Sequence, residues 1–175
     1  MSVSLFVLSI SAFERSLQAL KDFLAKAEAH AEARKFSPDN YLALRLAPDQ
    51  FPFLRQVQTC CDHAKNGAFR LAGQEPPRIE DNEASFAELR ARIETTLGLL
   101  KGLDAAEIEV GGTREIVFPI GPNRKAKMQG PNYLAHFVLP NFYFHLTTAY
   151  DILRAAGVEL GKRDFLGTPR DVTFV

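Results

Sequence analysis

Apolar residues recur every three or four positions along four stretches of the chain, which is the pattern of amphipathic helices. The four predicted helices run from Ser4 to about Ala33, from near Asp49 to Gly73, from Ser85 to near Gly102, and from about Asn132 to Ala156. Long connections that contain several prolines join the first three helices. The pattern therefore predicts an all-α fold, a four-helix bundle whose long connections allow crossover topology, with residues 1–175 forming a single domain.

A small β-structure is predicted between the third and fourth helices. Two short runs, 108–110 and 114–118, flank the pair Gly111-Gly112, and alternating or β-branched runs around such a pair are typical of a β-hairpin. Residues 121–132 have the composition of a loop. After the fourth helix, the tail is expected to pack across the bundle through Phe165 and Leu166.

The charge balance limits the possible partners, and the two cysteines indicate the cellular location. The 21 basic and 21 acidic residues balance, so no basic patch indicates nucleic acid or an anionic membrane surface as a partner. Glu14 and Arg15 interrupt the apolar start before membrane-spanning length, and no signal-peptide pattern precedes them. Cys60 and Cys61 are adjacent and cannot form an ordinary disulfide with each other, which indicates a reducing, cytoplasmic location.

The fourth helix carries a polar stripe on its inward face. At about 100° per residue, Asn141, His145 and Thr148 fall among apolar residues that face the bundle interior, whereas His136 falls on the opposite side. Asn141-x-x-x-His145 places two side chains one above the other, a spacing that a metal site on a helix would use. Pro140 directly precedes Asn141 inside this predicted helix, and a kink of the helix is expected there.

The second helix contributes one histidine near its apolar face. His63 lies on the flank of that face, beside Gln56 and Gly67, where it could line a cleft between two helices. It converges with His145 only if the second and fourth helices are neighbours, which the sequence alone does not decide.

Two stretches of the chain are similar to a known family. LRLAPDQFPFLRQVQTCCDHAK and GPNYLAHFVLPNFYFHLTTAYDILRAAGVELGKRDFLG resemble the signature stretches of the bacterial DUF1993 family, which belongs to the DinB/YfiT-like superfamily of four-helix bundles. The resemblance implies that fold. Several superfamily members bind a divalent metal through one histidine on the second helix and a His-x-x-x-His pair on the last bundle helix. Some of them use the metal in thiol-transferase or isomerase reactions.

The resemblance assigns three positions of this chain to that metal site. His63 looks like the ligand of the second helix, His145 looks like the second histidine of the pair, and Asn141 stands where the first histidine is expected. Zinc or nickel would prefer an imidazole to an amide oxygen at that place. The chain therefore departs from the triad at one of its three ligands.

Three interpretations of these polar residues follow. Asn141 and His145 can form a mutually hydrogen-bonded buried pair, they can hold a metal with His63, or these three and Thr148 can line a site for a small organic ligand. Two functions correspond to them, a ligand-binding or non-catalytic protein and a metal-dependent thiol transferase or isomerase. The run Phe142-Tyr143-Phe144 must turn at least one ring outward, which favours a homodimer.

Overall fold

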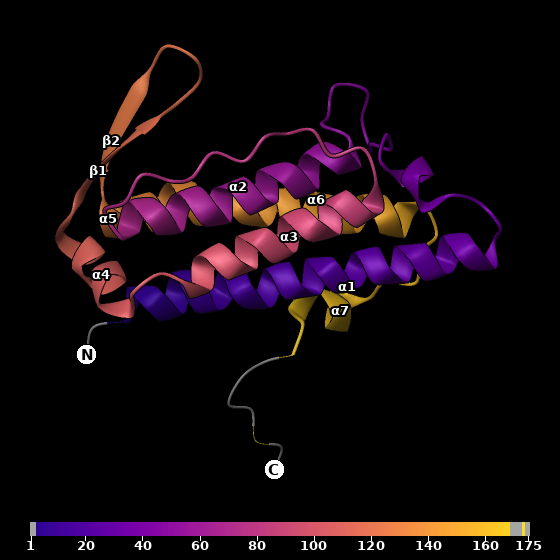
Figure 1. Ribbon diagram of the computed structural model, residues 1–175, viewed down its shortest axis with the longest axis horizontal. Helices are drawn as coiled ribbons and strands as arrows, with labels where there is room; N and C mark the ends of the chain where they lie inside the picture. The colour runs from indigo at the N-terminus through magenta and orange to yellow at the C-terminus, as the bar shows by residue number, and fades with distance from the viewer. Residues whose placement is uncertain (1–2, 169–172, 174–175) are drawn as a thin grey trace.

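Four long helices form the bundle in the computed structural model, which describes residues 3–168 and 173 (Figure 1). They are α1 (Ala12–Ala33), α2 (Phe53–Leu71), α3 (Phe86–Lys101) and α6 (Leu139–Ala155). Shorter helices are α4 (Ala105–Val110), α5 (Gly130–Tyr133) and α7 (Lys162–Leu166), with π-helical turns at Val7–Ser11 and Leu134–Val138 and 3-10 turns at Pro38–Tyr41 and Gly111–Thr113. The predicted helical bundle is confirmed.

The helix boundaries follow the local chemistry of their first residues. Ser85 caps α3, because its hydroxyl accepts a hydrogen bond from the backbone of Glu88, as the capping-box spacing predicts. The predicted start of the second helix near Asp49 is wrong. Pro52 is extended, with ψ 166°, so the helix begins only at Phe53.

The β-hairpin exists, but its turn lies elsewhere than predicted. Strand β1 (Glu115–Pro119) pairs antiparallel with β2 (Lys125–Gln129), so the turn is residues 120–124, while residues 108–110 belong to α4. Gly111 lies in the 3-10 turn Gly111–Thr113 instead of the hairpin turn, and it permits close packing there. A Cβ there would lie 2.6 Å from the carbonyl oxygen of Leu71, and one on Gly130 would lie 1.9 Å from that of Gly111. The hairpin projects to one side of the bundle, at the end where α4 and α5 lie (Figure 1).

Helices α2 and α6 are neighbours and make the most extensive helix contact in the bundle. Gly67 permits their close approach, because a Cβ at that position would lie 2.5 Å from Cγ1 of Val138. The core between the helices is built from leucine and phenylalanine, for example Phe13 against Phe142 with ring centroids 4.9 Å apart. The adjacency that the sequence left open is thereby settled.

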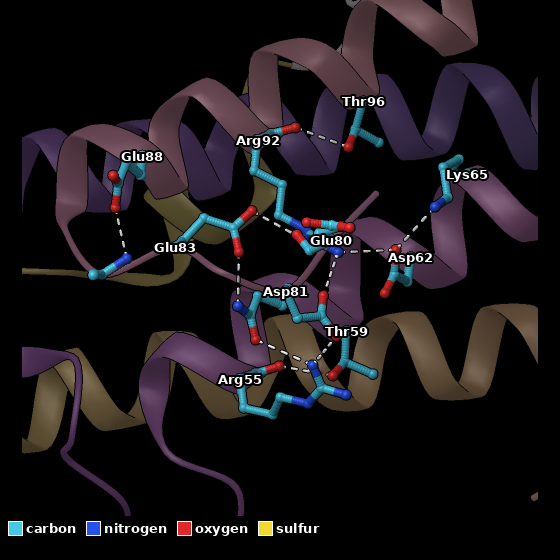
Figure 2. Close-up of polar contacts among 12 residues, drawn as sticks. Arg55, Thr59, Asp62, Lys65, Glu80, Asp81, Glu83, Glu88, Arg92 and Thr96 are labelled. Atoms are coloured by element: carbon cyan, nitrogen blue, oxygen red, sulfur yellow. Dashed lines mark hydrogen bonds and ion pairs between the residues drawn. The ribbon is translucent and has the colours of Figure 1, made fainter. Parts of the chain in front are cut away.

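The connection between α2 and α3 is held along the helices by an ion network that centres on a buried arginine (Figure 2). Arg92 of α3 has a side chain only 1% exposed. Its Nη2 lies 3.0 Å from Oδ1 of Asp62 and 2.9 Å from Oδ1 of Asp81, and its Nη1 lies 2.9 Å from Oε1 of Glu83. Arg55 pairs with Asp81, and Lys65 pairs with Asp62 at 3.1 Å. We call these six residues the Arg92 network.

The end of the described chain crosses α1. Helix α7 packs against α1, the ring of Phe165 meets that of Tyr150 at 5.7 Å, and Lys26 pairs with Asp164 at 2.7 Å. The expected contact through Phe165 is confirmed. Leu166, in contrast, is largely exposed. Across residues 3–168, no helix is long and apolar enough to span a bilayer.

Candidate functional site

Helices α2 and α6 bring His63 and His145 together. The two imidazole rings lie nearly parallel, with 11° between their planes and 5.6 Å between their centroids. His145 is buried, and His63 is half-buried on the flank of α2, as its helical position predicts. His136 is exposed on the other side of its helix, also as predicted. We call His63 and His145 the histidine pair.

Gln56 orients the imidazole of His145. The side chain lies two turns before His63 on α2 and is buried. Its Nε2 donates to the backbone carbonyl of Phe51 at 2.9 Å, and its Oε1 lies 2.7 Å from Nδ1 of His145. The amide therefore links the connection before α2 to the ring on α6.

Asn141 and Thr148 form hydrogen bonds within their own helix. The Nδ2 of Asn141 donates to the carbonyl of Phe137 at 2.7 Å, and the hydroxyl of Thr148 donates to the carbonyl of Phe144 at 2.7 Å. Thr148 is buried as predicted, and Asn141 is half-buried. The expected mutual bond between Asn141 and His145 is replaced by these bonds and by the one to Gln56.

The helix changes its winding just before Asn141. Pro140 lacks an amide hydrogen for the carbonyl of His136, and the preceding residues Leu134–Val138 form a π-helical turn. The structure thus has a π-helical turn just before Pro140, where the sequence predicts a kink.

Both histidines of the pair are held neutral. Burial lowers the pKa of His63 to about 4, helped by the charge of Arg70. Burial likewise lowers the pKa of His145 to about 4, with smaller contributions from His63 and from the charge of Arg55. At pH 7 the site therefore presents two uncharged imidazoles near two guanidinium groups.

Aromatic rings surround the histidine pair, and two of them reach the surface. Phe51 lies nearly parallel to His145 with centroids 6.4 Å apart and is 50% exposed. Phe144 lies perpendicular to His145 at 5.2 Å and is 58% exposed. The ring of Phe137 meets His63 edge-on at 5.9 Å. The expectation that one ring of Phe142-Tyr143-Phe144 faces outward is confirmed at Phe144.

The residues of the site do not complete a metal centre of the expected kind. Within residues 3–168 no group of three or more histidine, cysteine, aspartate or glutamate side chains is placed to hold an ion. Catalytic zinc sites use three protein ligands, and here Asn141 replaces an imidazole with an amide whose nitrogen is bonded to Phe137. The positive charges of Arg55 and Arg70 oppose a cation further.

The two cysteines behave as small apolar residues. Both are free and buried. Burial raises the pKa of the Cys61 thiol to about 12 in spite of the nearby Arg92, and it raises that of Cys60 well above its usual value. Neither thiol forms the thiolate that nucleophilic chemistry requires.

Sequence reasoning placed Gln56 beside His63 but missed its bond to His145, and it missed Phe51 altogether. Gln56 lies seven residues before His63, a spacing that puts both on one helical face, and this was the available signal. Phe51 belongs to an irregular connection, where no periodicity indicates the direction of a side chain.

Comparisons with known proteins agree with this architecture. Residues 5–166 match the model of DUF1993, a domain of unknown function. The chain is similar to a solved structure of a DinB family member from Shewanella denitrificans, with 41% identity over 97% of this chain and 95% of that chain and a TM-score of 0.89. No curated protein matches it. The chain thus belongs to the DUF1993 family and has the fold of a DinB family member.

Proposed function

We propose that this protein is a non-catalytic bundle that binds a small neutral organic ligand at the histidine pair. The observation that carries the proposal is a pair of neutral, adjacent imidazoles, with no third histidine, cysteine or carboxylate placed to ligate a metal with them in the part of the chain that the structure describes. A neutral imidazole accepts one hydrogen bond and donates one, so the pair suits recognition of a polar group.

The surroundings of the pair favour an uncharged ligand with an apolar part. Phe51 and Phe144 offer two exposed rings beside His145, and ligand sites commonly combine such apolar walls with a few polar groups. The arginines disfavour a cation. In this proposal His63 and His145 contact the polar group, and Asn141 and Thr148 shape the wall on α6.

We also propose that the protein is a cytoplasmic homodimer. Phe144 of α6 and Phe51 are both exposed and both lie against His145, and neighbouring exposed rings mark an interaction surface where a single ring would not. Light scattering measures the mass in solution. A dimer that becomes a monomer in Phe144→Ser supports an interface at α6, whereas a wild-type monomer contradicts the homodimer.

A second candidate function is a divalent-metal-dependent enzyme of the thiol-transferase or isomerase type. One observation favours it. Histidines that ligate a metal usually donate their other ring N–H to a fixed acceptor, and His145 has such an acceptor in Gln56. His63 and His145 would then hold zinc or nickel, with Asn141 or water completing the shell.

Metal analysis separates the two candidates. Natively purified protein is analysed by inductively coupled plasma spectrometry before and after exposure to zinc, nickel and manganese, with His63→Ala and His145→Ala as controls. The proposal predicts substoichiometric metal in all three proteins. Stoichiometric metal that disappears in both variants would contradict the proposal and support the enzyme.

Ligand binding is measured at the imidazoles themselves. In protein labelled with ¹⁵N on histidine, a small aromatic ligand should move the ring resonances of His63 and His145. The exposed His136 serves as an internal reference, because it lies on the other side of its helix. A response confined to His136 would contradict a site at the pair.

A further inference from the structure

Gln56 occupies a position from which it can decide which nitrogen of His145 carries the proton. The amide is buried and makes two hydrogen bonds, one to a backbone carbonyl and one to the ring. A carbonyl oxygen only accepts, so the group that faces Phe51 must be the NH₂ of the amide. The opposite orientation would bring two oxygens together.

The orientation of the amide fixes the tautomer of His145. With its NH₂ on Phe51, Gln56 turns Oε1 toward Nδ1 of His145 at 2.7 Å. Since Oε1 can only accept, Nδ1 must donate. In a neutral ring the proton then resides on Nδ1, and Nε2 keeps a free lone pair.

We propose that Gln56 is the specificity-determining residue of the histidine pair, and that by holding His145 protonated on Nδ1 it selects a neutral aromatic ligand that donates a hydrogen bond, such as a phenol. The inference rests on the proposed ligand-binding function and deepens it. An Nε2 lone pair accepts from O–H or N–H and gains nothing from a ligand that only accepts.

The rest of the ligand class follows from the groups around the ring. Phe51 and Phe144 supply apolar faces for an aromatic ring. Cationic donors are disfavoured because Arg55 lies over the ring of Phe51 at 5.8 Å and Arg70 lies close enough to His63 to act on it electrostatically. A phenol combines an uncharged hydrogen-bond donor with an aromatic ring that can pack against Phe51 and Phe144.

The tautomer is read from long-range ¹H–¹⁵N spectra of histidine-labelled protein, without any ligand. Wild-type His145 is expected to be protonated on Nδ1. In Gln56→Met the acceptor is lost and the proton is expected to move to Nε2, whereas in Gln56→Glu a carboxylate oxygen keeps it on Nδ1. Gln58→Met is the matched control, because Gln58 is buried on the same helix but bonds to Glu83 and should leave His145 unchanged.

Selectivity is tested with phenol and with anisole, which has the same ring but only an acceptor oxygen. Phenol should move the His145 resonances of the wild type more than anisole does, and Gln56→Met should lose this preference. Wild-type His145 protonated on Nε2, or equal responses to the two probes, overturns the inference. No response to either probe, with Nδ1 protonated, contradicts the proposed function and leaves the role of Gln56 in setting the tautomer intact.

Discussion

Two polar clusters include residues of helix α2. The Arg92 network consists of paired charges, whereas the histidine pair consists of uncharged imidazoles. Asp62 and His63 are consecutive residues, yet Asp62 turns toward Arg92 of α3 and His63 turns toward His145 of α6. The Arg92 network keeps its charges, three cations against three anions, and the connection between α2 and α3 lies across it (Figure 2). The two imidazoles of the histidine pair are instead uncharged at pH 7.

The difference indicates which cluster serves stability and which serves recognition. Buried charges persist only when they are paired, and in the Arg92 network each charge already faces an opposite charge of the fold instead of a ligand. The histidine pair is neutral, keeps a lone pair on His145, and has two exposed aromatic rings beside it. We therefore assign the Arg92 network to the stability of the fold, and the proposed function assigns the histidine pair to ligand binding.

The largest expected effect of a single substitution comes from breaking the Arg92 network. Arg92→Met leaves Glu83 buried without its cation and removes a partner from Asp62 and Asp81. We expect a loss of about 3 kcal/mol in the free energy of unfolding, at the lower end for a broken buried pair because both aspartates keep some contact with water. Urea denaturation measures it.

The matched control for Arg92→Met is Arg90→Ala. Arg90 pairs with Glu28 at the surface, where an ion pair contributes at most about 1 kcal/mol. Equal losses in the two variants would show that the buried network is not the source of stability assigned to it.

Acid should weaken the fold through the histidine pair. Unfolded histidines take up protons near pH 6.5, whereas His63 and His145 stay neutral in the fold down to about pH 4. The unfolded state then binds more protons between these values, so the contribution is fully present above pH 6.5 and falls as the pH drops toward 4. The slope is roughly 1.4 kcal/mol per pH unit for each histidine.

The test compares wild type with the double variant His63→Gln/His145→Gln by urea denaturation at pH 7, 6 and 5. The free energy of unfolding of the variant should fall less steeply with acid. Parallel curves for the two proteins would contradict the neutral state assigned to the pair.

A smaller effect is expected from the contact that holds α2 against α6. Gly67→Ala would place a Cβ 2.5 Å from Val138, so the two helices must shift, at a net loss of about 1–2 kcal/mol. Gly98→Ala is the matched control on α3, because no atom lies within 4 Å of its Cβ. It should gain about 0.5–1 kcal/mol from helix propensity. Thermal unfolding distinguishes the two signs.

Periodicity predicted the parts of this structure that depend on neighbours in sequence. The four helices and the inward direction of His145 and Thr148 follow from a repeat of 3.6 residues. The position of the hairpin was predicted wrongly, because Gly111 and Gly130 permit close packing between backbone segments that are distant in sequence. No local pattern indicates such packing. The bonds of Arg92 and the bond between Gln56 and His145 join residues 9 to 89 positions apart, and a single sequence does not indicate such pairs.

The most direct test of the central claim is a zinc titration of wild type and Asn141→His, followed by calorimetry. The claim is that the histidine pair lacks a third ligand because an amide stands at position 141. The account predicts weak, substoichiometric uptake by the wild type and stoichiometric, much tighter uptake by Asn141→His. Wild-type protein that binds zinc stoichiometrically, and as tightly as the variant, would contradict it.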